Sequence, residues 1–446
     1  MVRRMLTSPV QQAREKVSSL RTNSLLRNSL YLMTATIVTS LLGYVYWTAA
    51  ARLFPTHDVG LASALISAVT LAALISSFGL GPTLISWLPR RSIGRDWSLT
   101  LNVAFVTGAA SGFIAGAALV VLLPMLSSQF APVRDNAVIG LTVLTFVPVW
   151  TITQLFDCTF IAERSAGNLL LRNAVFAMLK ILLLLVPLLF VFTGIFGILS
   201  SWLLASLLSV AIACWALARL GRQYAPTIRG ARAEVRTMFT TMTGNQFTAL
   251  GASLPVLLLP TIVTIRLSAT DNAYFYTTWM MGGLFFMVSI SVSQSLFAEG
   301  AHAAEHLRRN VLRSARIIVA LLAVPMLVYI FAGQYIMGLF GPEYAKNGFA
   351  LLMLLTAAAV PDAITNIYVA AQRVLRRLQY AAALNVFMGV VTIALAWFLL
   401  PVFGVAGAGL AWLAGQSAGS IAVGIHIASD AHRNRRLRQA GRFASA

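Results

Sequence analysis

The chain has 446 residues, of which 59% are hydrophobic and only 10% are charged. A soluble domain carries about 25% charged residues, so this composition excludes an ordinary soluble protein and indicates a multi-spanning membrane protein. The formal net charge of +20 would also suit a nucleic-acid-binding protein. The basic residues lie in short loops and tails beside apolar segments, however, so we expect no nucleic-acid partner.

Twelve segments are apolar over about the 20 residues that a membrane span needs. In chain order they are 28–51, 61–81, 99–124, 137–159, 174–193, 198–218, 241–264, 273–296, 315–338, 348–370, 381–400 and 405–427. An even number places both termini on one side, and the loops and tails on that side hold 28 of the 33 Lys and Arg residues. Positively charged loops stay in the cytoplasm, so we predict cytoplasmic termini.

The chain opens with a basic tail over residues 1–27. Ser8 and Gln11 fit a capping box at the start of a helix, and apolar residues recur at helical spacing behind it. This pattern predicts an amphipathic helix on the membrane surface. The basic tails and loops also predict contact with anionic lipid headgroups.

The fifth predicted span, 174–193, carries Lys180 among apolar residues. A charge at that depth costs about 2.5–3.5 kcal/mol, so it needs a partner or a water-filled cavity. Asp157 near the inner end of the fourth span lies at a similar predicted depth of roughly 10 Å, which predicts an ion pair between Lys180 and Asp157. A second interpretation, compatible with the first, is that Lys180 faces a hydrated cavity and attracts an anionic ligand.

The two halves of the chain repeat each other. The segment "GIFGILSSWL" (194–203) matches "GVAGAGLAWL" (404–413) at an offset of 210, and "FAP" (130–132) matches "FGP" (340–342) at the same offset. With one gap, "RLFPTHD" (52–58) also matches "RLSATD" (266–271). Each half begins on the cytoplasmic side, so these matches predict a parallel duplication, an arrangement found in transporters with the substrate between the two halves.

The fold class that follows is an all-α polytopic membrane protein with twelve transmembrane helices in two parallel-repeat six-helix lobes around a central cavity. We predict an N-terminal lobe over 28–218, a cytoplasmic basic linker over 219–240 and a C-terminal lobe over 241–428. A cytoplasmic basic tail over 429–446 ends the chain.

Signatures of catalysis are scarce in the sequence. It has no P-loop and no glycine-rich dinucleotide fingerprint between a strand and a helix. The stretch "HAAEH" (302–306) fits a zinc-hydrolase pattern, but it has no third ligand nearby and reads more simply as a polar helix end. Cys158 and Cys214 lie in apolar runs and predict neither a disulfide nor a metal site. We therefore expect no enzymatic activity and no cofactor.

Three stretches carry a family resemblance: "NSLYLMTATIVTSLLGYVYWTAAARLFPTHDVGLASAL" (28–65), "RNAVFAMLKILLLL" (172–185) and "NAYFYTTWMMGGLFFMVSISVSQSLFAEGA" (272–301). Together they resemble the polysaccharide flippases, which carry O-antigen and related lipid-linked oligosaccharides within the multidrug/oligosaccharidyl-lipid/polysaccharide exporter superfamily. The resemblance implies two six-helix bundles around a cationic cavity. It further implies a bacterial plasma-membrane protein that moves polyprenyl-pyrophosphate-linked sugars from the inner to the outer leaflet by alternating access. Glycosyltransferases and a polysaccharide polymerase would be its partners, and coupling to H⁺ or Na⁺ stays open.

Ionisable and polar residues within or beside the spans agree with an anionic cargo, because a pyrophosphate needs cationic partners. Arg52 and Arg266 are equivalent by the repeat, each at the outer end of a span. There they either hydrogen-bond the last carbonyls of their helices or act as a gate for the phosphates. Asp362 and Asn366 are four residues apart and share a helix face, which should point into the protein. The predicted substrate-binding residues are Lys180, Arg52, Arg266, Asp157, Asn245, Gln246, Gln294, Asp362 and Asn366.

Three other functions stay as alternatives. The related ion-coupled multidrug antiporters usually carry a carboxylate in the N-terminal lobe, whereas the first span here has no acid and Asp157 is the single acid within that lobe's spans. The related lipid II flippases tend to have fourteen spans, two more than predicted here. A membrane-embedded glycosyltransferase or polymerase would need a long outward loop with paired carboxylates, and the outward loops are short.

Overall fold

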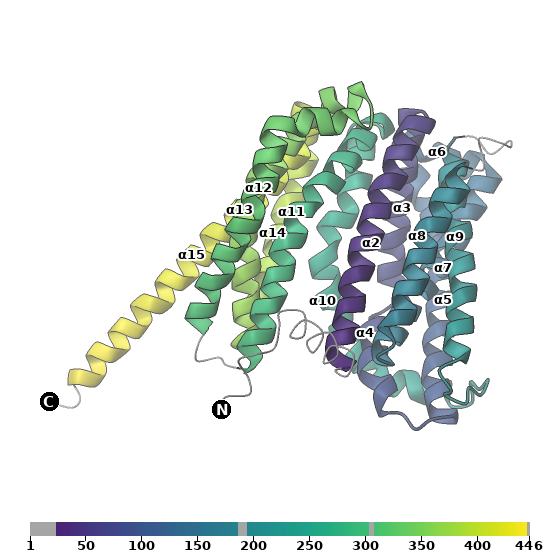
Figure 1. The fold of residues 1–446 in the computed structure, drawn as a ribbon, viewed down its shortest axis with the longest axis horizontal. Helices are drawn as coiled ribbons and strands as arrows, with labels where there is room; N and C mark the ends of the chain where they lie inside the picture. The colour runs from purple at the N-terminus through teal and green to yellow at the C-terminus, as the bar shows by residue number, and fades with distance from the viewer. Residues whose placement is uncertain (1–23, 186–193, 303–306, 444–446) are drawn as a thin grey trace, which may run out of the picture. The chain divides into compact units, whose positions relative to one another are not determined.

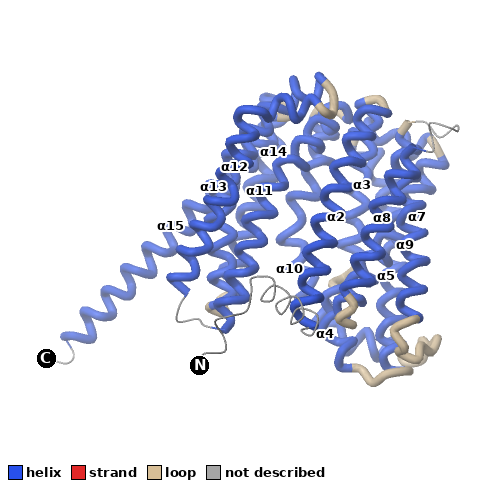
Figure 2. Tube along the Cα trace, viewed as in Figure 1, coloured by secondary structure: helices blue, strands red, loops and turns tan. Residues whose placement is uncertain are grey.

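The computed structural model describes residues 24–185, 194–302 and 307–443, which form helices and loops and contain no strand (Figures 1 and 2). The α-helices are α2 (Ser24–Leu53), α3 (Thr56–Ser76), α4 (Leu80–Trp87), α5 (Arg95–Leu126), α6 (Ala131–Asp135), α7 (Ala137–Ala162), α8 (Ala166–Leu185), α9 (Ile195–Ala218), α10 (Ala231–Arg266), α11 (Ala269–His302), α12 (Leu307–Gly338), α13 (Pro342–Val374), α14 (Leu378–Phe403) and α15 (Ala406–Phe443). Two 3₁₀-helices, η2 (Leu88–Arg90) and η3 (Ser128–Phe130), complete the described elements.

Ten helices in the described ranges are long and apolar enough to cross a membrane, and each overlaps a predicted span. The other two predicted spans, 28–51 and 241–264, lie within α2 and α10. In α10 the apolar stretch is the shorter segment Ser253–Arg266. The chain is therefore an all-helical, multi-pass membrane protein, and the number of twelve spans stays a prediction.

The second predicted span ends earlier than its apolar sequence indicates. Helix α3 ends at Ser76, and Phe78 and Gly79 then adopt left-handed backbone angles, with φ of 45° and 70°. A side chain at Gly79 would lie 2.2 Å from the carbonyl oxygen of Met242 on α10. Glycine is therefore required here both for the turn and for the close approach of α10.

The turn between α7 and α8 is shorter than predicted. The basic loop expected over 160–173 shrinks to residues 163–165, because α7 continues to Ala162 and α8 begins at Ala166. Arg164 adopts a left-handed φ of 52°, which closes the turn. The last residues of the fifth predicted span, 186–193, lie outside the described residues.

Parts of the predicted tails also fall outside the description. Most of the tail 1–27 and residues 303–306 of "HAAEH" are not described, so these predictions stay untested. The C-terminal tail begins as a continuation of α15, which extends to Phe443.

The helices pack into two compact units. The first, called unit 1, contains the described parts of 1–47, 72–120 and 137–246, and unit 2 contains those of 48–71, 121–136 and 247–446. Each unit draws on both sequence halves, because α10 contributes to both and the end of α2 belongs to unit 2. The division into six-helix lobes at the linker stays a prediction.

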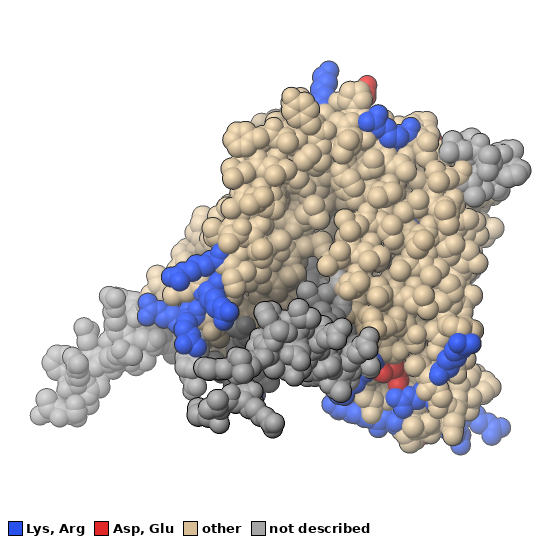
Figure 3. Space-filling model, in the orientation of Figure 1, with Lys and Arg blue, Asp and Glu red and all other residues tan. Residues whose placement is uncertain are grey.

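Two carboxylates of unit 1 hold the segment that was predicted as a linker. Glu163, whose side chain is 2% exposed, pairs with Arg222 and accepts a hydrogen bond from Trp97 Nε1 at 2.7 Å. Glu234 in the first turn of α10 likewise pairs with Arg91 and accepts from Thr100 Oγ1. Lys and Arg side chains gather at the ends of the helices on the face that Figure 3 shows.

Helix α13 is central to unit 2, where it packs against α11, α12, α14 and α15. The start of α3 is tied into the same unit by Asn272 of α11. Its Nδ2 donates to the carbonyl oxygen of Gly60 at 2.8 Å and to Ser63 Oγ at 3.0 Å. Polar residues of α11 and α13 line one interior cavity of this unit, described below.

Candidate functional site

A cavity of about 360 Å³ lies within unit 1 between α2, α7 and α8. Its volume is within the roughly 300–1,000 Å³ range of small-molecule sites. Residues of α2 contribute small and hydroxyl side chains, and α7 and α8 contribute the charged and aromatic ones. The lining residues are Ala35, Thr36, Thr39, Trp150, Thr153, Gln154, Asp157, Leu169, Arg172, Asn173, Phe176, Ala177 and Lys180.

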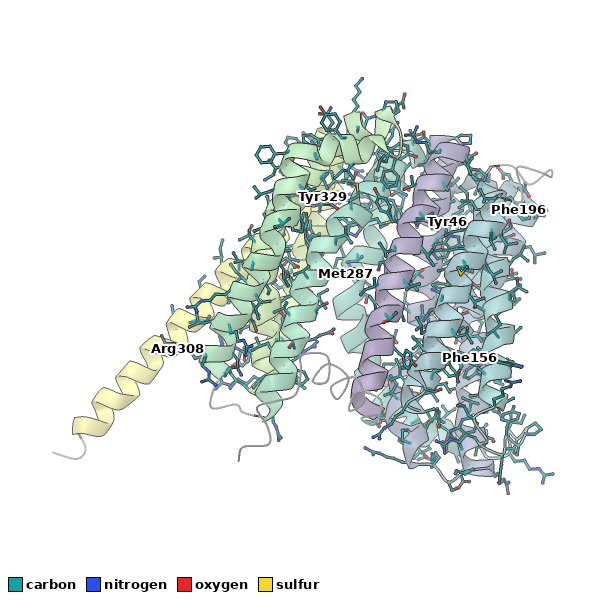
Figure 4. The ribbon with its side chains drawn as sticks, viewed as in Figure 1. Tyr46, Phe156, Phe196, Met287, Arg308 and Tyr329 are labelled. Carbon is teal, nitrogen blue, oxygen red and sulfur yellow. The ribbon has the colours of Figure 1, made fainter. Side chains whose placement is uncertain are left out.

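Lys180 lies in a cage of aromatic rings. Its side chain is buried, and Nζ is 4.4 Å from the ring centre of Trp202, 5.0 Å from Tyr46 and 5.3 Å from Phe176. Tyr46, labelled in Figure 4, is held by a 2.8 Å hydrogen bond between its hydroxyl and Ser201 Oγ. Aromatic faces attract cations by about 0.5–2 kcal/mol each, so the cage supports a buried ammonium group without a carboxylate.

The predicted ion pair between Lys180 and Asp157 is wrong. Asp157 pairs instead with Arg172 of α8, whose Nη2 is 2.7 Å from both carboxylate oxygens and whose Nε is 3.0 Å from Oδ1. Asn173 adds a longer contact of 3.4 Å to Oδ1. The pairing across the helical hairpin was anticipated, and its basic partner was misassigned.

The early start of α8 explains the misassignment. Asp157 lies five residues before the end of α7 and Arg172 six residues after the start of α8. At about 1.5 Å per residue, these positions are roughly 8 and 9 Å from the hairpin turn. Lys180 lies fourteen residues into α8, or roughly 21 Å from the turn. Arg172 and Asp157 therefore lie at about the same distance from the hairpin turn, and Lys180 lies about 12 Å further along α8.

The cavity has an excess of positive charge. Lys180 and Arg172 oppose the single carboxylate Asp157, and Arg172 Nη1 has no hydrogen-bond partner among the described residues. Burial makes such a free donor costly unless a ligand or water completes it. The arrangement suits an anion with several acceptor oxygens.

Sequence reasoning missed Arg172 and the aromatic cage. Arg172 was counted among the loop cations because it lies beside polar Asn173 and ahead of the apolar run. Trp202 did carry a signal, because the repeat pairs it with Trp412 at the same offset. A repeated tryptophan inside an apolar span was evidence of duplication and also of a shared aromatic cluster.

A second cavity of about 460 Å³ lies within unit 2. Three predicted residues, Gln294, Asp362 and Asn366, line it, and Asp362 is only 4% exposed. Met287 of α11, labelled in Figure 4, is also in the lining. Asp362 and Asn366 thus face one interior space, as their spacing on one helix predicts.

Asn245 and Gln246 lie elsewhere, in the part of α10 that belongs to unit 1. Asn245 Nδ2 donates to Thr83 Oγ1 at 3.2 Å, and Gln246 Nε2 donates to the carbonyl oxygen of Leu74 at 2.9 Å. Asn245 therefore connects α10 to α4, and Gln246 connects it to the end of α3.

Arg52 and Arg266 share the predicted position in the last turn of their helices but have different surroundings. Arg52 donates at 2.8 Å to the carbonyl oxygens of Gly338 and Leu339, at the end of α12 rather than of its own helix. Arg266 stacks on Trp397 at 4.6 Å. Arg52 therefore caps another helix in unit 2, where basic side chains are favoured by the helix dipole.

The described residues contain no group of three or more His, Cys, Asp or Glu side chains that could hold a metal ion. The two cavities described above offer a cationic, aromatic site in unit 1 and a polar, aromatic site in unit 2.

Several solved structures share this fold. A multidrug resistance MATE family transporter of the MOP superfamily, in an inward-facing conformation, matches with a TM-score of 0.64 and 15% identity over 89% of this chain and 96% of the other. The lipid II flippase MurJ, in an inward closed conformation, matches with a TM-score of 0.69 and 12% identity over 88% and 86%. A MOP superfamily transporter from Pyrococcus furiosus, described as having a binding pocket of reverse polarity, matches with a TM-score of 0.57 and 15% identity over 90% and 93%.

At identities this low, these likenesses establish the fold of the MOP superfamily transporters. A comparison with curated proteins finds none that matches the chain in sequence. The model of one family, described as polysaccharide biosynthesis protein, matches residues 25–291, which is more than half of the chain. The chain is therefore a multi-pass membrane protein that belongs to the polysaccharide biosynthesis protein family.

Proposed function

We propose that this protein flips a polyprenyl-pyrophosphate-linked oligosaccharide from the inner to the outer leaflet of a bacterial plasma membrane for cell-surface polysaccharide biosynthesis. It does so by alternating access, without chemical conversion of the cargo and with both termini in the cytoplasm. Glycosyltransferases supply the cargo and a polysaccharide polymerase uses it. Anionic lipids contact the basic loops.

The observation that carries the proposal is the caged cation of unit 1. Lys180 has three aromatic rings around its ammonium group and lies fourteen residues, or roughly 21 Å, from the start of α8. A buried ionisable residue in a membrane span marks a substrate or ion pathway by default. Together with Arg172 it offers two cations to an anion, which a pyrophosphate would satisfy.

The ion pair between Asp157 and Arg172 is relevant to the alternative function, that of an ion-coupled multidrug antiporter. In the sequence, Asp157 is the single acid within the spans of the first half, and its carboxylate is engaged by three contacts with Arg172. A coupling ion or an organic cation would have to displace a buried guanidinium to reach it. This arrangement favours the anionic cargo over the cationic one.

The proposal is tested by complementation. A strain that lacks the gene should accumulate its lipid-linked glycan in the inner leaflet, and the wild-type chain should relieve this accumulation. We expect Lys180→Met, which keeps an apolar stem inside the aromatic cage, to reach the membrane in normal amount but to lose at least nine tenths of export. Lys180→Arg should retain a measurable part, because the positive charge is kept.

A rescue experiment separates charge neutralisation from substrate contact. Since Asp157 pairs with Arg172, adding Asp157→Ala to Lys180→Ala should not restore export. Export at the wild-type rate by Lys180→Met, or rescue by the double change, would refute the role of Lys180 in cargo binding.

A further inference from the structure

The unit 2 cavity contains an aromatic corner. Trp279 of α11 and Trp412 of α15 meet with ring centres 4.8 Å apart and planes 86° apart, and Phe286 lies within 6.0 Å of each. All three rings line the cavity, and each is at most 9% exposed. Two flat aromatic faces at right angles form a corner against which a small ring can rest.

Comparison of the two repeats shows that the residue matching Lys180 does not cover this corner. Trp412 matches Trp202 at the offset of 210, and Trp202 carries Lys180 against its face. The residue that matches Lys180 at the same offset is Val390, which is 61% exposed and absent from the cavity lining. In unit 1 the chain itself covers the tryptophan with a cation, whereas in unit 2 the matching tryptophan faces the cavity.

Hydrogen-bonding groups around the corner are buried and unpaired. Ser293 Oγ, Asp362 Oδ2 and Trp412 Nε1 have no hydrogen-bond partner among the described residues, although all three residues line the cavity and are at most 8% exposed. A buried polar group that is left without a hydrogen-bond partner destabilises the folded protein. Three of them around one cavity therefore point to a ligand with several polar groups.

The donor and acceptor character of these three groups limits the kinds of ligand that the cavity could bind. The indole N–H donates only, the carboxylate oxygen accepts, and the serine hydroxyl does either. A metal ion needs acceptors alone, so the indole donor would not serve it, and an acyl chain needs neither. A sugar ring offers hydroxyls that donate and accept, together with an apolar C–H face that fits an aromatic surface.

Further amides and hydroxyls complete a hydrophilic wall. Gln416 accepts a hydrogen bond from Thr365 at 3.0 Å, so both are held in place beside the corner. Asn366 is positioned by a 2.9 Å bond to the carbonyl oxygen of Asp362, and Gln294 lies on the same cavity. The volume of about 460 Å³ is within the roughly 300–1,000 Å³ typical of small-molecule sites.

We propose that the unit 2 cavity is a glycan subsite, in which a sugar ring of the cargo stacks in the corner of Trp279 and Trp412 and hydrogen-bonds to Ser293, Asp362 and Trp412 Nε1. This inference rests on the proposed function, because it assigns the sugar part of the same cargo. It gives the cavity a role in selecting which glycan is transported, separate from that of the cationic site.

The test compares probes that differ only in their sugar. Purified full-length protein is titrated with radiolabelled farnesyl diphosphate and with the same compound bearing a short oligosaccharide of glucose, galactose or N-acetylglucosamine. We expect at least one sugar-bearing probe to bind about tenfold more tightly than farnesyl diphosphate. Trp412→Phe and Asp362→Asn should each remove most of that gain and change the Kd of farnesyl diphosphate less than twofold.

Two further variants distinguish a loss of sugar binding from a general loss of folding. Trp215→Phe, a matched change at an exposed position of α9, should keep the full gain. Ser293→Ala, a milder change, should reduce the gain even if the larger substitutions impair folding, and an unchanged Kd for farnesyl diphosphate shows that a variant is folded.

Three results would overturn the glycan subsite: no gain with any of the sugars, a gain that survives both Trp412→Phe and Asp362→Asn, or binding of tetraphenylphosphonium that depends on Asp362 in place of a sugar gain. The proposed function fails differently, by absence of farnesyl diphosphate binding or by its indifference to Lys180→Met. A protein that binds farnesyl diphosphate through Lys180 but shows no sugar gain keeps the first proposal and loses the second.

Discussion

Removing the carboxylate of Asp157 should destabilise the protein far more than removing the whole ion pair. The Arg172 side chain is 2% exposed, and without Asp157 its guanidinium would keep one hydrogen bond, to Asn173 Oδ1 at 2.6 Å. Breaking a buried pair from one side costs about 3–5 kcal/mol, because a buried charge is left uncompensated. The Asp157 side chain is 29% exposed at the cavity, so we expect the lower end, about 3 kcal/mol for Asp157→Ala.

The double variant Asp157→Ala/Arg172→Met has no stranded charge and should lose only about 1 kcal/mol, which is about 2 kcal/mol less than Asp157→Ala alone. Free energies of unfolding are measured by reversible denaturation in mixed micelles. Lys180→Met serves as the matched control, because Lys180 lies about 12 Å further along α8 and its effect should add to that of Asp157→Ala within about 0.5 kcal/mol. Equal stability of Asp157→Ala and the double variant would refute this reasoning, as would strong coupling to Lys180.

Three further predictions concern single positions. Gly79→Ala should cost at least about 1–2 kcal/mol for the left-handed backbone alone and more for its clash with α10. In the same unfolding assay Gly43→Ala, which lies within α2 and meets nothing within 4 Å, should be neutral or stabilise the protein by up to about 1 kcal/mol. Glu163→Gln should speed tryptic cleavage within 219–230 several-fold, because the hydrogen bonds that the carboxylate holds are worth about 1.5–3 kcal/mol each. Asp135→Asn, a control at an exposed ion pair, should leave the cleavage rate unchanged. Equal cleavage rates for the two variants would contradict the prediction. Arg52→Gln should lower thermal stability, since an amide cannot span both carbonyls at the end of α12, and an unchanged melting temperature would show that this cap contributes little.

Composition and charge pattern determined much of the architecture. Long apolar segments must form helices in a membrane, because every backbone polar group has to be satisfied within its own segment. This local requirement explains why the ten membrane-length helices found in the described residues were predictable. It also explains why Asp362 and Asn366 were expected on one inward face, since helical spacing alone places them together.

Helix boundaries and side-chain partners were decided by tertiary structure. Apolar sequence continues through Phe78 and Gly79, so hydrophobicity alone does not mark the end of α3. Gly79 supplies the turn there, and the close approach of α10 requires a residue without a side chain at this position. At the start of α8, polar residues hid the helix, because Arg172 and Asn173 are satisfied by Asp157 across the hairpin and not by water. A shift of two helical turns was enough to exchange one basic partner of Asp157 for another.

The two cavities also have some features that the sequence determined and others that only the tertiary structure decided. The sequence determined that Lys180 is a charge within a span and that Trp202 and Trp412 repeat, both of which are readable from spacing. Which rings surround the ammonium group depends on the packing of α8 against α9, the next helix in the chain, and against α2, which is distant in sequence. Contacts of this kind depend on the angle and depth at which helices meet, and hydrophobic periodicity does not encode those quantities, because all faces of a buried helix in a membrane are apolar.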